Sequence, residues 1–195
     1  GQNEFTVAAQ GEDFRIDGDS LRHVYGGFGQ WTYALDRRSR ASVSFQATKL
    51  DYPGLGNRDA MRYVGSVGYM IALPFARDPV VYAGAYGGME DEQHSAFGQF
   101  GHDLYGGRLG GSIGILPKTR AFASVSAEQR DYHGGDPIFL RTRDDTQYII
   151  SGGLEYAAGD NWMVRPNVTY TNNNSNIPIN DYDRVIVGID VTMQF

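Results

Sequence analysis

Hydrophobic and polar residues alternate along most of the chain, and the alternation recurs ten times. A period of two is typical of a β-strand with one apolar and one polar face, whereas helices repeat apolar residues three and four positions apart. In the last such segment, Val185, Val187 and Ile189 share one face, opposite polar residues such as Asp190. The ten predicted strands cover residues 4–14, 21–35, 41–51, 60–72, 79–91, 103–116, 121–132, 146–157, 162–172 and 182–195.

The segments between the predicted strands alternate in length. Short turns are expected at 36–40, 74–78, 117–120 and 158–161, and longer loops near 15–20, 52–59, 92–102, 133–145 and 173–181. Short turns at one end and long loops at the other are the plan of an outer-membrane barrel. Both termini are expected at the short-turn end.

Alternation alone does not separate a membrane barrel from a soluble one, because a soluble lipocalin-type barrel is also two-faced, with the faces inverted. Aromatic spacing favours the membrane. Tyr148 and Tyr156 lie eight residues apart on one apolar face, as do Trp162 and Tyr170 on the next strand. At about 3.3 Å per residue and a strand tilt near 40°, this spacing projects to roughly 20 Å, close to the apolar band between aromatic girdles. These four residues and Trp31 form the predicted aromatic girdle.

Arginine dominates the positive charge and changes the interpretation of the polar faces. The chain has 17 basic residues, of which only Lys49 and Lys118 are lysines. Arginine tolerates desolvation because its planar guanidinium pairs bidentately with carboxylates. We therefore expect the polar faces to line a crowded lumen with a network of paired charges. Its predicted members are Arg22, Arg62, Arg108, Glu128, Arg130, Glu155, Arg165, Arg184 and Asp190.

The C-terminal strand resembles the assembly signal of outer-membrane proteins. A final aromatic residue, Phe195, follows the alternate hydrophobic residues Val191 and Met193. No apolar run approaches the roughly 18 residues that a transmembrane helix needs. The sequence thus predicts a single domain over residues 1–195, an all-β transmembrane antiparallel up-and-down β-barrel of about ten strands in the bacterial outer membrane.

The last 55 residues carry a more specific likeness. Asn161-Trp162, Pro166, Tyr170, the segment NNNSNIP at 172–178, and the pair Tyr182 and Arg184 resemble the C-terminal barrel of surface lipoprotein assembly modifiers and related tetratricopeptide-linked exporters. That resemblance implies a barrel that helps to move lipoproteins or polymers to the cell surface. Members of that family also carry a helical repeat domain and a larger barrel, and this sequence shows neither, which leaves a smaller relative or part of a larger barrel.

Two clusters near the long-loop end contain histidine and carboxylates, a combination that can activate water. They are Glu90, Asp91, Glu92 and His94, and Asp131, His133 and Asp136. Acidic loop residues are more often simply solvated, and neither cluster has a protease pattern, so we expect no catalytic residues and no enzymatic activity.

Acidic pairs in the loops offer oxygen ligands that suit Ca²⁺ or Mg²⁺. They are Asp17-Gly18-Asp19 and Asp144-Asp145. No defined ligand spacing accompanies them, so we expect no metal site and no cofactor.

Charge is distributed unevenly between the two ends. The short turns are basic, with Arg37, Arg38 and Arg77, whereas the long loops carry carboxylates such as Asp51 and Asp181. An acidic rim favours cationic partners or divalent bridges to lipopolysaccharide phosphates, and a sequence pI near 5.1 argues against nucleic acid. The expected partners are outer-membrane lipid and lipopolysaccharide, the outer-membrane assembly machinery, and an exported protein or polymer.

Three functions remain open from the sequence. The first is a translocation or export-associated barrel with a narrow charged lumen. The second is a closed structural or adhesin-like barrel that binds a partner through its long acidic loops. The third, the least favoured, is a hydrolase at the rim. Barrels of few strands have a lumen filled by side chains, and barrels of many strands enclose an open channel. A barrel of about ten strands is closer in size to the filled ones.

Overall fold

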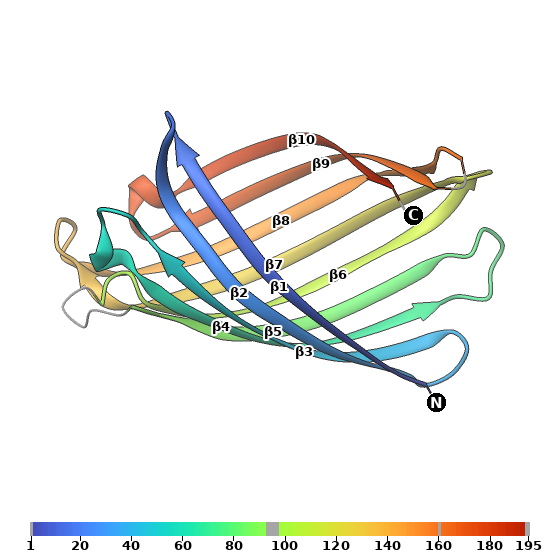
Figure 1. Cartoon of the computed structure of the whole chain (residues 1–195), viewed down its shortest axis with the longest axis horizontal. Helices are drawn as coiled ribbons and strands as arrows, with labels where there is room; N and C mark the ends of the chain where they lie inside the picture. Colours follow the sequence, from blue (N-terminus) through green and yellow to red (C-terminus); the bar gives the residue numbers. More distant parts are fainter. Residues whose placement is uncertain (1, 93–97, 160, 194–195) are drawn as a thin grey trace.

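The computed structural model describes residues 2–92, 98–159 and 161–193. Its ten strands form one antiparallel sheet in which every strand pairs with its neighbours in chain order (Figure 1). The strands are β1 (Asn3–Ile16), β2 (Asp19–Ala34), β3 (Ser39–Asp51), β4 (Ala60–Ala72), β5 (Val80–Glu92), β6 (His102–Leu116), β7 (Thr119–Asp136), β8 (Arg141–Ala157), β9 (Trp162–Ser175) and β10 (Tyr182–Met193). Two short 3₁₀ turns, η1 (Gly56–Arg58) and η3 (Pro178–Asn180), lie in the loops.

The prediction of an all-β fold with ten antiparallel up-and-down strands is confirmed. Both chain ends lie at the short-turn end of the sheet (Figure 1), since Asn3 pairs with Tyr33 and Met193 pairs with Trp162. No helix in the described ranges is long and apolar enough to cross a membrane.

The prediction of a long loop is wrong in two places. In place of a loop near 15–20, β1 and β2 join through a two-residue turn of Asp17 (φ 52°) and Gly18 (φ 91°). Asp-Gly is the pair that most readily adopts the two positive φ angles of such a hairpin turn. In place of a loop over 133–145, β7 continues to Asp136 and β8 begins at Arg141, because backbone pairing extends past the apolar part of both strands.

The sheet is strongly curved but not closed, which differs from the predicted complete barrel (Figure 1). Every strand pairing joins chain neighbours, and β1 has no partner on its outer edge among the described residues. All fourteen residues of β1 are exposed. A turn or loop imposes each of the nine neighbour pairings, whereas pairing β1 with β10 would join the two ends of the chain and carries the largest loop-closure entropy.

The two faces of the sheet differ in polarity as the sequence predicts. Along the strands, most exposed apolar side chains point to the convex outer face, and most polar or small side chains point to the concave inner face. Exposed outer-face residues form an apolar belt around the sheet that includes Val7, Phe45, Val67, Leu109, Val125, Ile150, Val168 and Val187. Few apolar side chains of the described residues are buried: Val24, Leu50 and Ala60 form a small cluster packed against Tyr52 near the long loops, and Leu104 and Ile177 are buried outside that cluster. A belt of this kind is typical of the lipid-facing surface of an outer-membrane barrel.

Candidate functional site: the inner face of the sheet

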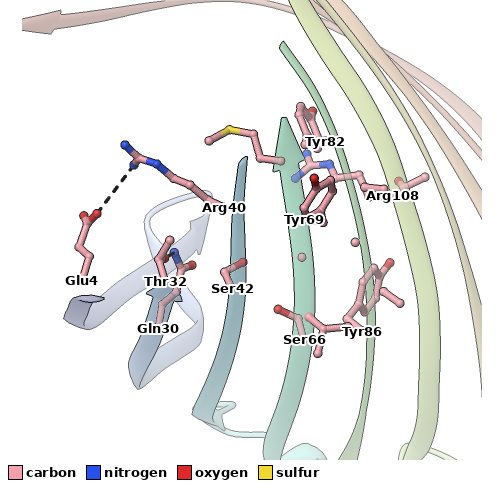
Figure 2. A pocket seen from close by; sticks show the side chains of 17 residues that line it. Glu4, Gln30, Thr32, Arg40, Ser42, Ser66, Tyr69, Tyr82, Tyr86 and Arg108 are labelled. Atoms are coloured by element: carbon pink, nitrogen blue, oxygen red, sulfur yellow. Dashed lines mark hydrogen bonds and ion pairs between the residues drawn. The ribbon is translucent and has the colours of Figure 1, made fainter. Parts of the chain in front are cut away.

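The inner face holds a cavity of about 710 Å³ in its short-turn half. It exists because one row of paired residues is small. Strand register places Ser42 opposite Gly68, Gly68 opposite Gly84, Gly84 opposite Arg108, and Arg108 opposite Ser126. Arg108 is thus the only long side chain in a row of glycines and serines. We call this space the Arg108 cavity (Figure 2).

Two tyrosines of β5 flank Arg108 on the inner face (Figure 2). Each reaches across the wall to a glycine of β6. A β-carbon at Gly106 would lie 2.6 Å from Cζ of Tyr86, and one at Gly110 would lie 2.5 Å from Cζ of Tyr82. The two phenol rings therefore occupy the space that side chains on β6 would fill, and they leave the middle of the cavity open.

Arg108 has no ion pair or side-chain hydrogen bond within the described part of the chain. The other charged residues of the cavity, Arg40 and Glu4, lie 3.9 Å apart at its edge and offset each other (Figure 2). The Arg108 cavity therefore carries one uncompensated positive charge, surrounded by the hydroxyl groups of Ser42, Ser66 and Ser126.

A second cavity, of about 500 Å³, lies on the inner face towards the long loops. We call it the outer cavity. Its arginines are mostly paired: Arg22 Nη2 lies 3.2 Å from Glu12 Oε1, and Arg130 Nε donates to Glu128 Oε1 at 2.6 Å. Arg62 also lines it, without an ion pair among the described residues. The outer cavity is also lined by Gln10, Gln46, Tyr86, Glu90 and His102.

The remaining members of the predicted charge network also lie on the inner face. Arg165 Nε is 3.5 Å from Glu155 Oε1, and its guanidinium lies over Phe122 at 4.1 Å. Asp190 accepts a hydrogen bond from Asn167 at 2.8 Å. Arg184 lies 5.7 Å from the ring centre of Tyr182. The ion pair and the hydrogen bond join adjacent strands, and the contact of Arg165 with Phe122 spans β8, from β9 to β7. A single network that lines a pore stays a prediction.

The predicted girdle residues all belong to the outer face and are partly exposed there. Trp31 Nε1 donates to Asn3 at 2.9 Å near the short turns, and Tyr170 Oη donates to Asp183 at 2.6 Å towards the long loops. Val191 and Met193 of the predicted assembly signal are exposed on the same face. Phe195 lies outside the described residues, and the roles of girdle and signal stay predictions.

The two candidate catalytic clusters do not form catalytic arrangements in the described residues. Glu90 lines the inner face, whereas Asp91 follows it on the alternating outer face, and His94 lies outside the described residues. His133 Nε2 lies 3.5 Å from Asp103 Oδ2, and Asp103 does not belong to the predicted cluster. Asp136 accepts backbone hydrogen bonds from residues 138 and 139 and thereby stabilises the β7–β8 turn.

The candidate cation ligands are likewise used in structural contacts. Asp17 belongs to the β1–β2 turn, Asp144 accepts a hydrogen bond from Gln129 at 2.7 Å, and the fully buried Asp145 pairs with Arg143. The described residues contain no group of three or more His, Cys, Asp or Glu side chains able to hold a metal ion.

The sequence prediction missed the inner-face tyrosines. Tyr82, Tyr86 and Tyr132 received no role, although each falls on the polar face of its strand. The available signal was the pair of glycines on either side of Arg108 on the same face, Gly106 and Gly110, because glycine inside a strand marks a close approach of another group. Which group approaches depends on the register of the neighbouring strand.

The features above define a class of protein. An antiparallel up-and-down sheet with an apolar outer face and a charged, hydroxyl-rich inner face has the architecture of a porin-like β-barrel.

Comparison with known proteins gives a partial likeness to the same class. Residues 122–195 match the family described as Putative beta-barrel porin 2. No curated protein sequence matches the chain. Among solved structures, the chain is similar to one titled Copper transporter OprC, with 11% sequence identity and a TM-score of 0.45. The similarity covers 97% of this chain and 36% of that one, so this chain spans little more than a third of the length of that protein.

Proposed function

We propose that this protein is an integral outer-membrane β-barrel that works in translocation or export, with its inner face lining a narrow charged path. The observation that carries the proposal is the division of polarity between the two faces. The outer belt suits the hydrocarbon region of a bilayer, and the inner face offers hydrated cavities lined by arginine, carboxylates and hydroxyl groups.

Three further features support passage through the interior. The Arg108 cavity and the outer cavity share Tyr86, so they adjoin along the inner wall. The small residues Ser42, Gly68, Gly84 and Ser126 leave room for a solute in the Arg108 cavity. The likeness of the last 55 residues to barrels of surface lipoprotein assembly modifiers supports an exported polymer or lipoprotein as the cargo.

Single-channel recording in planar bilayers tests the proposal. We expect the refolded protein to give small conductance steps, and Arg62→Glu to shift ion selectivity towards cations, because Arg62 lines the outer cavity without an ion pair in the described part of the chain. Arg37→Glu, in an exposed turn, is the control and leaves selectivity unchanged. A folded barrel that never conducts would contradict the proposal.

A closed, surface-binding barrel is the second candidate, because the long loops reach over the interior. Ile177 in the β9–β10 loop is completely buried, and Ile179 and Phe100 line a cavity of about 330 Å³ together with inner-face residues such as Glu90. Silent bilayers, together with binding of the folded protein to lipopolysaccharide-containing vesicles, would favour this candidate.

A further inference from the structure

The Arg108 cavity combines three recognition elements whose ligand the proposed function leaves unnamed. It contains one arginine without a partner in the described residues, two tyrosine rings laid along the wall, and a set of serine hydroxyls. A volume of about 710 Å³ falls within the range of small-molecule sites. An arrangement of this kind selects a ligand by its chemistry.

We propose that the Arg108 cavity binds an acidic sugar, that is, a hydroxyl-bearing ring that carries a carboxylate. The proposal rests on the proposed function, since it names the class of solute that the inner face would take. Each of the three elements matches one part of such a ligand.

Arg108 matches the carboxylate. A guanidinium without an ion pair offers two parallel N–H donors, and carboxylates accept this fork in a bidentate, charge-assisted geometry. The nearest opposite charge in the cavity, Glu4, is already opposed by Arg40 at 3.9 Å. An incoming anion therefore meets no competing carboxylate at Arg108.

Tyr82 and Tyr86 match the ring. Because their phenol ends cover Gly110 and Gly106, the aromatic surfaces lie against the wall on both sides of Arg108 instead of blocking the cavity. The apolar C–H face of a sugar packs against such a surface. Ser42, Ser66 and Ser126, with Gln30 and Thr32 on the neighbouring strand, supply donors and acceptors for its hydroxyl groups.

Glycines keep the site open. A β-carbon at Gly68 would lie 2.9 Å from Ser42 Oγ, and one at Gly84 would lie 3.0 Å from the carbonyl oxygen of Val67. Side chains at these positions would fill the space in front of Arg108. The outer cavity lacks this arrangement, because Arg22 and Arg130 there already pair with glutamates and Arg62 stands opposite the carboxylate-bearing Glu90.

Isothermal titration calorimetry of the full chain, folded in detergent, tests the proposal with digalacturonate as the probe. We expect saturable binding, at least tenfold weaker binding of the neutral galactobiose, and at least a tenfold loss of digalacturonate affinity in Arg108→Gln. Tyr86→Ala lowers the affinity, whereas Tyr86→Phe keeps most of it because the ring remains. Arg37→Gln removes the same charge in an exposed turn and leaves binding unchanged.

Heat-modifiable gel migration shows for each variant that the barrel is folded. Equal binding of the acidic and neutral sugars, or unchanged affinity in folded Arg108→Gln, would overturn the proposal. Inorganic phosphate that binds as tightly as digalacturonate would show a general anion site instead. Because binding is measured in detergent, a silent barrel that binds digalacturonate contradicts only the proposed passage, and a conducting barrel that does not bind it contradicts only the sugar site.

Discussion

Single residues of the inner wall show how little space separates neighbouring strands. A β-carbon at Gly88 would lie 2.0 Å from the carbonyl oxygen of Tyr63 and 2.9 Å from Cα of Val64. Both are backbone atoms of β4, which cannot move without shifting a hydrogen-bonded strand. At Gly29 on β2, which lies on the outer face opposite Val7 and Phe45, a β-carbon would meet nothing within 4 Å.

The first prediction concerns these two glycines. Gly88→Ala lowers the free energy of unfolding by about 1–3 kcal/mol, the usual cost of overpacking, or prevents folding, whereas Gly29→Ala changes it little. Urea unfolding of the protein refolded in lipid vesicles measures both. Equal stability of the two variants would show that β4 and β5 are not packed as closely as described.

A second residue-scale prediction concerns pH. In the β2–β3 turn, Asp36 Oδ1 accepts the backbone N–H groups of Arg38 at 2.7 Å and Ser39 at 2.8 Å. The hydrogen bond from Arg38, followed by those from Ser39, lowers the pKa of the Asp36 carboxyl below its ordinary 3.8. Since the folded-state pKa is the lower one, the stabilisation is fully present above the unfolded value and is lost as pH falls through the folded value.

We therefore expect Asp36→Ala to be less stable than the parent protein at neutral pH, with the difference shrinking as the pH drops below 3.8. Urea titrations between neutral and acidic pH measure it. Arg37→Ala, in the same turn, provides the control, with a stability difference that does not depend on acidic pH. A constant difference for Asp36→Ala at all pH values would contradict the assigned hydrogen bonds.

At the scale of the strand, the face of the sheet to which a side chain points decides which substitutions the position tolerates. Val7 and Thr6 are neighbours on β1, and their side chains point to opposite faces, with Val7 86% exposed on the apolar outer face. In water the two positions would accept charge alike, because both are exposed. In a bilayer they differ, because only one of them faces hydrocarbon.

The third prediction follows from this difference. Val7→Arg destabilises the folded protein in lipid by about 2–4 kcal/mol if it lies near the bilayer midplane, whereas Thr6→Arg has a much smaller effect because its side chain points to the polar interior. Unfolding in phosphatidylcholine vesicles measures both variants. A smaller effect for Val7→Arg than for Thr6→Arg would contradict the assignment of the outer face to lipid.

At the scale of the whole molecule, the strand register indicates how the open sheet closes. A row of residues can be followed from partner to partner across all ten strands. The row begins at Asn3 on β1, at the short-turn end, and ends at Val185 on β10, near the long loops. Strands in a barrel are staggered, so closure requires β10 to be shifted along β1. A shift of about ten residues over ten strands spaced about 4.8 Å apart gives a tilt of about 35°, within the range of outer-membrane barrels.

The fourth prediction is that β1 and β10 pair with this stagger, which places Val7 opposite Val191. The chain has no cysteine, so the double variant Val7→Cys/Val191→Cys forms a disulfide without competition, detected as a mobility shift that reductant reverses. Val7→Cys/Val185→Cys is the control and does not cross-link, because its partners lie about six residues, or roughly 20 Å, apart along the seam. Cross-linking of the control pair instead would show a different register, and cross-linking of neither pair would contradict the proposed stagger.

The strands themselves could be predicted from the sequence because a period of two is a local signal. The inside and outside positions of residues such as Arg165 and Val168 follow from the same alternation. Strand ends at the long loops were less predictable, since backbone pairing alone extends β7 to Asp136 and β8 from Arg141. There the side chains no longer alternate in polarity, and only the partner strand decides where the ladder ends.

The candidate site, like the strands, could be predicted only in part from the sequence. Sequence placed Arg108 on the polar face and grouped it with charges expected to pair. Only the tertiary structure decided that Arg108 stands opposite Gly84 and Ser126, between Tyr82 and Tyr86, with no ion pair among the described residues. The physical reason is that the face of a side chain is set by its own strand, whereas its neighbours across the wall are set by the register between strands, which no local pattern encodes.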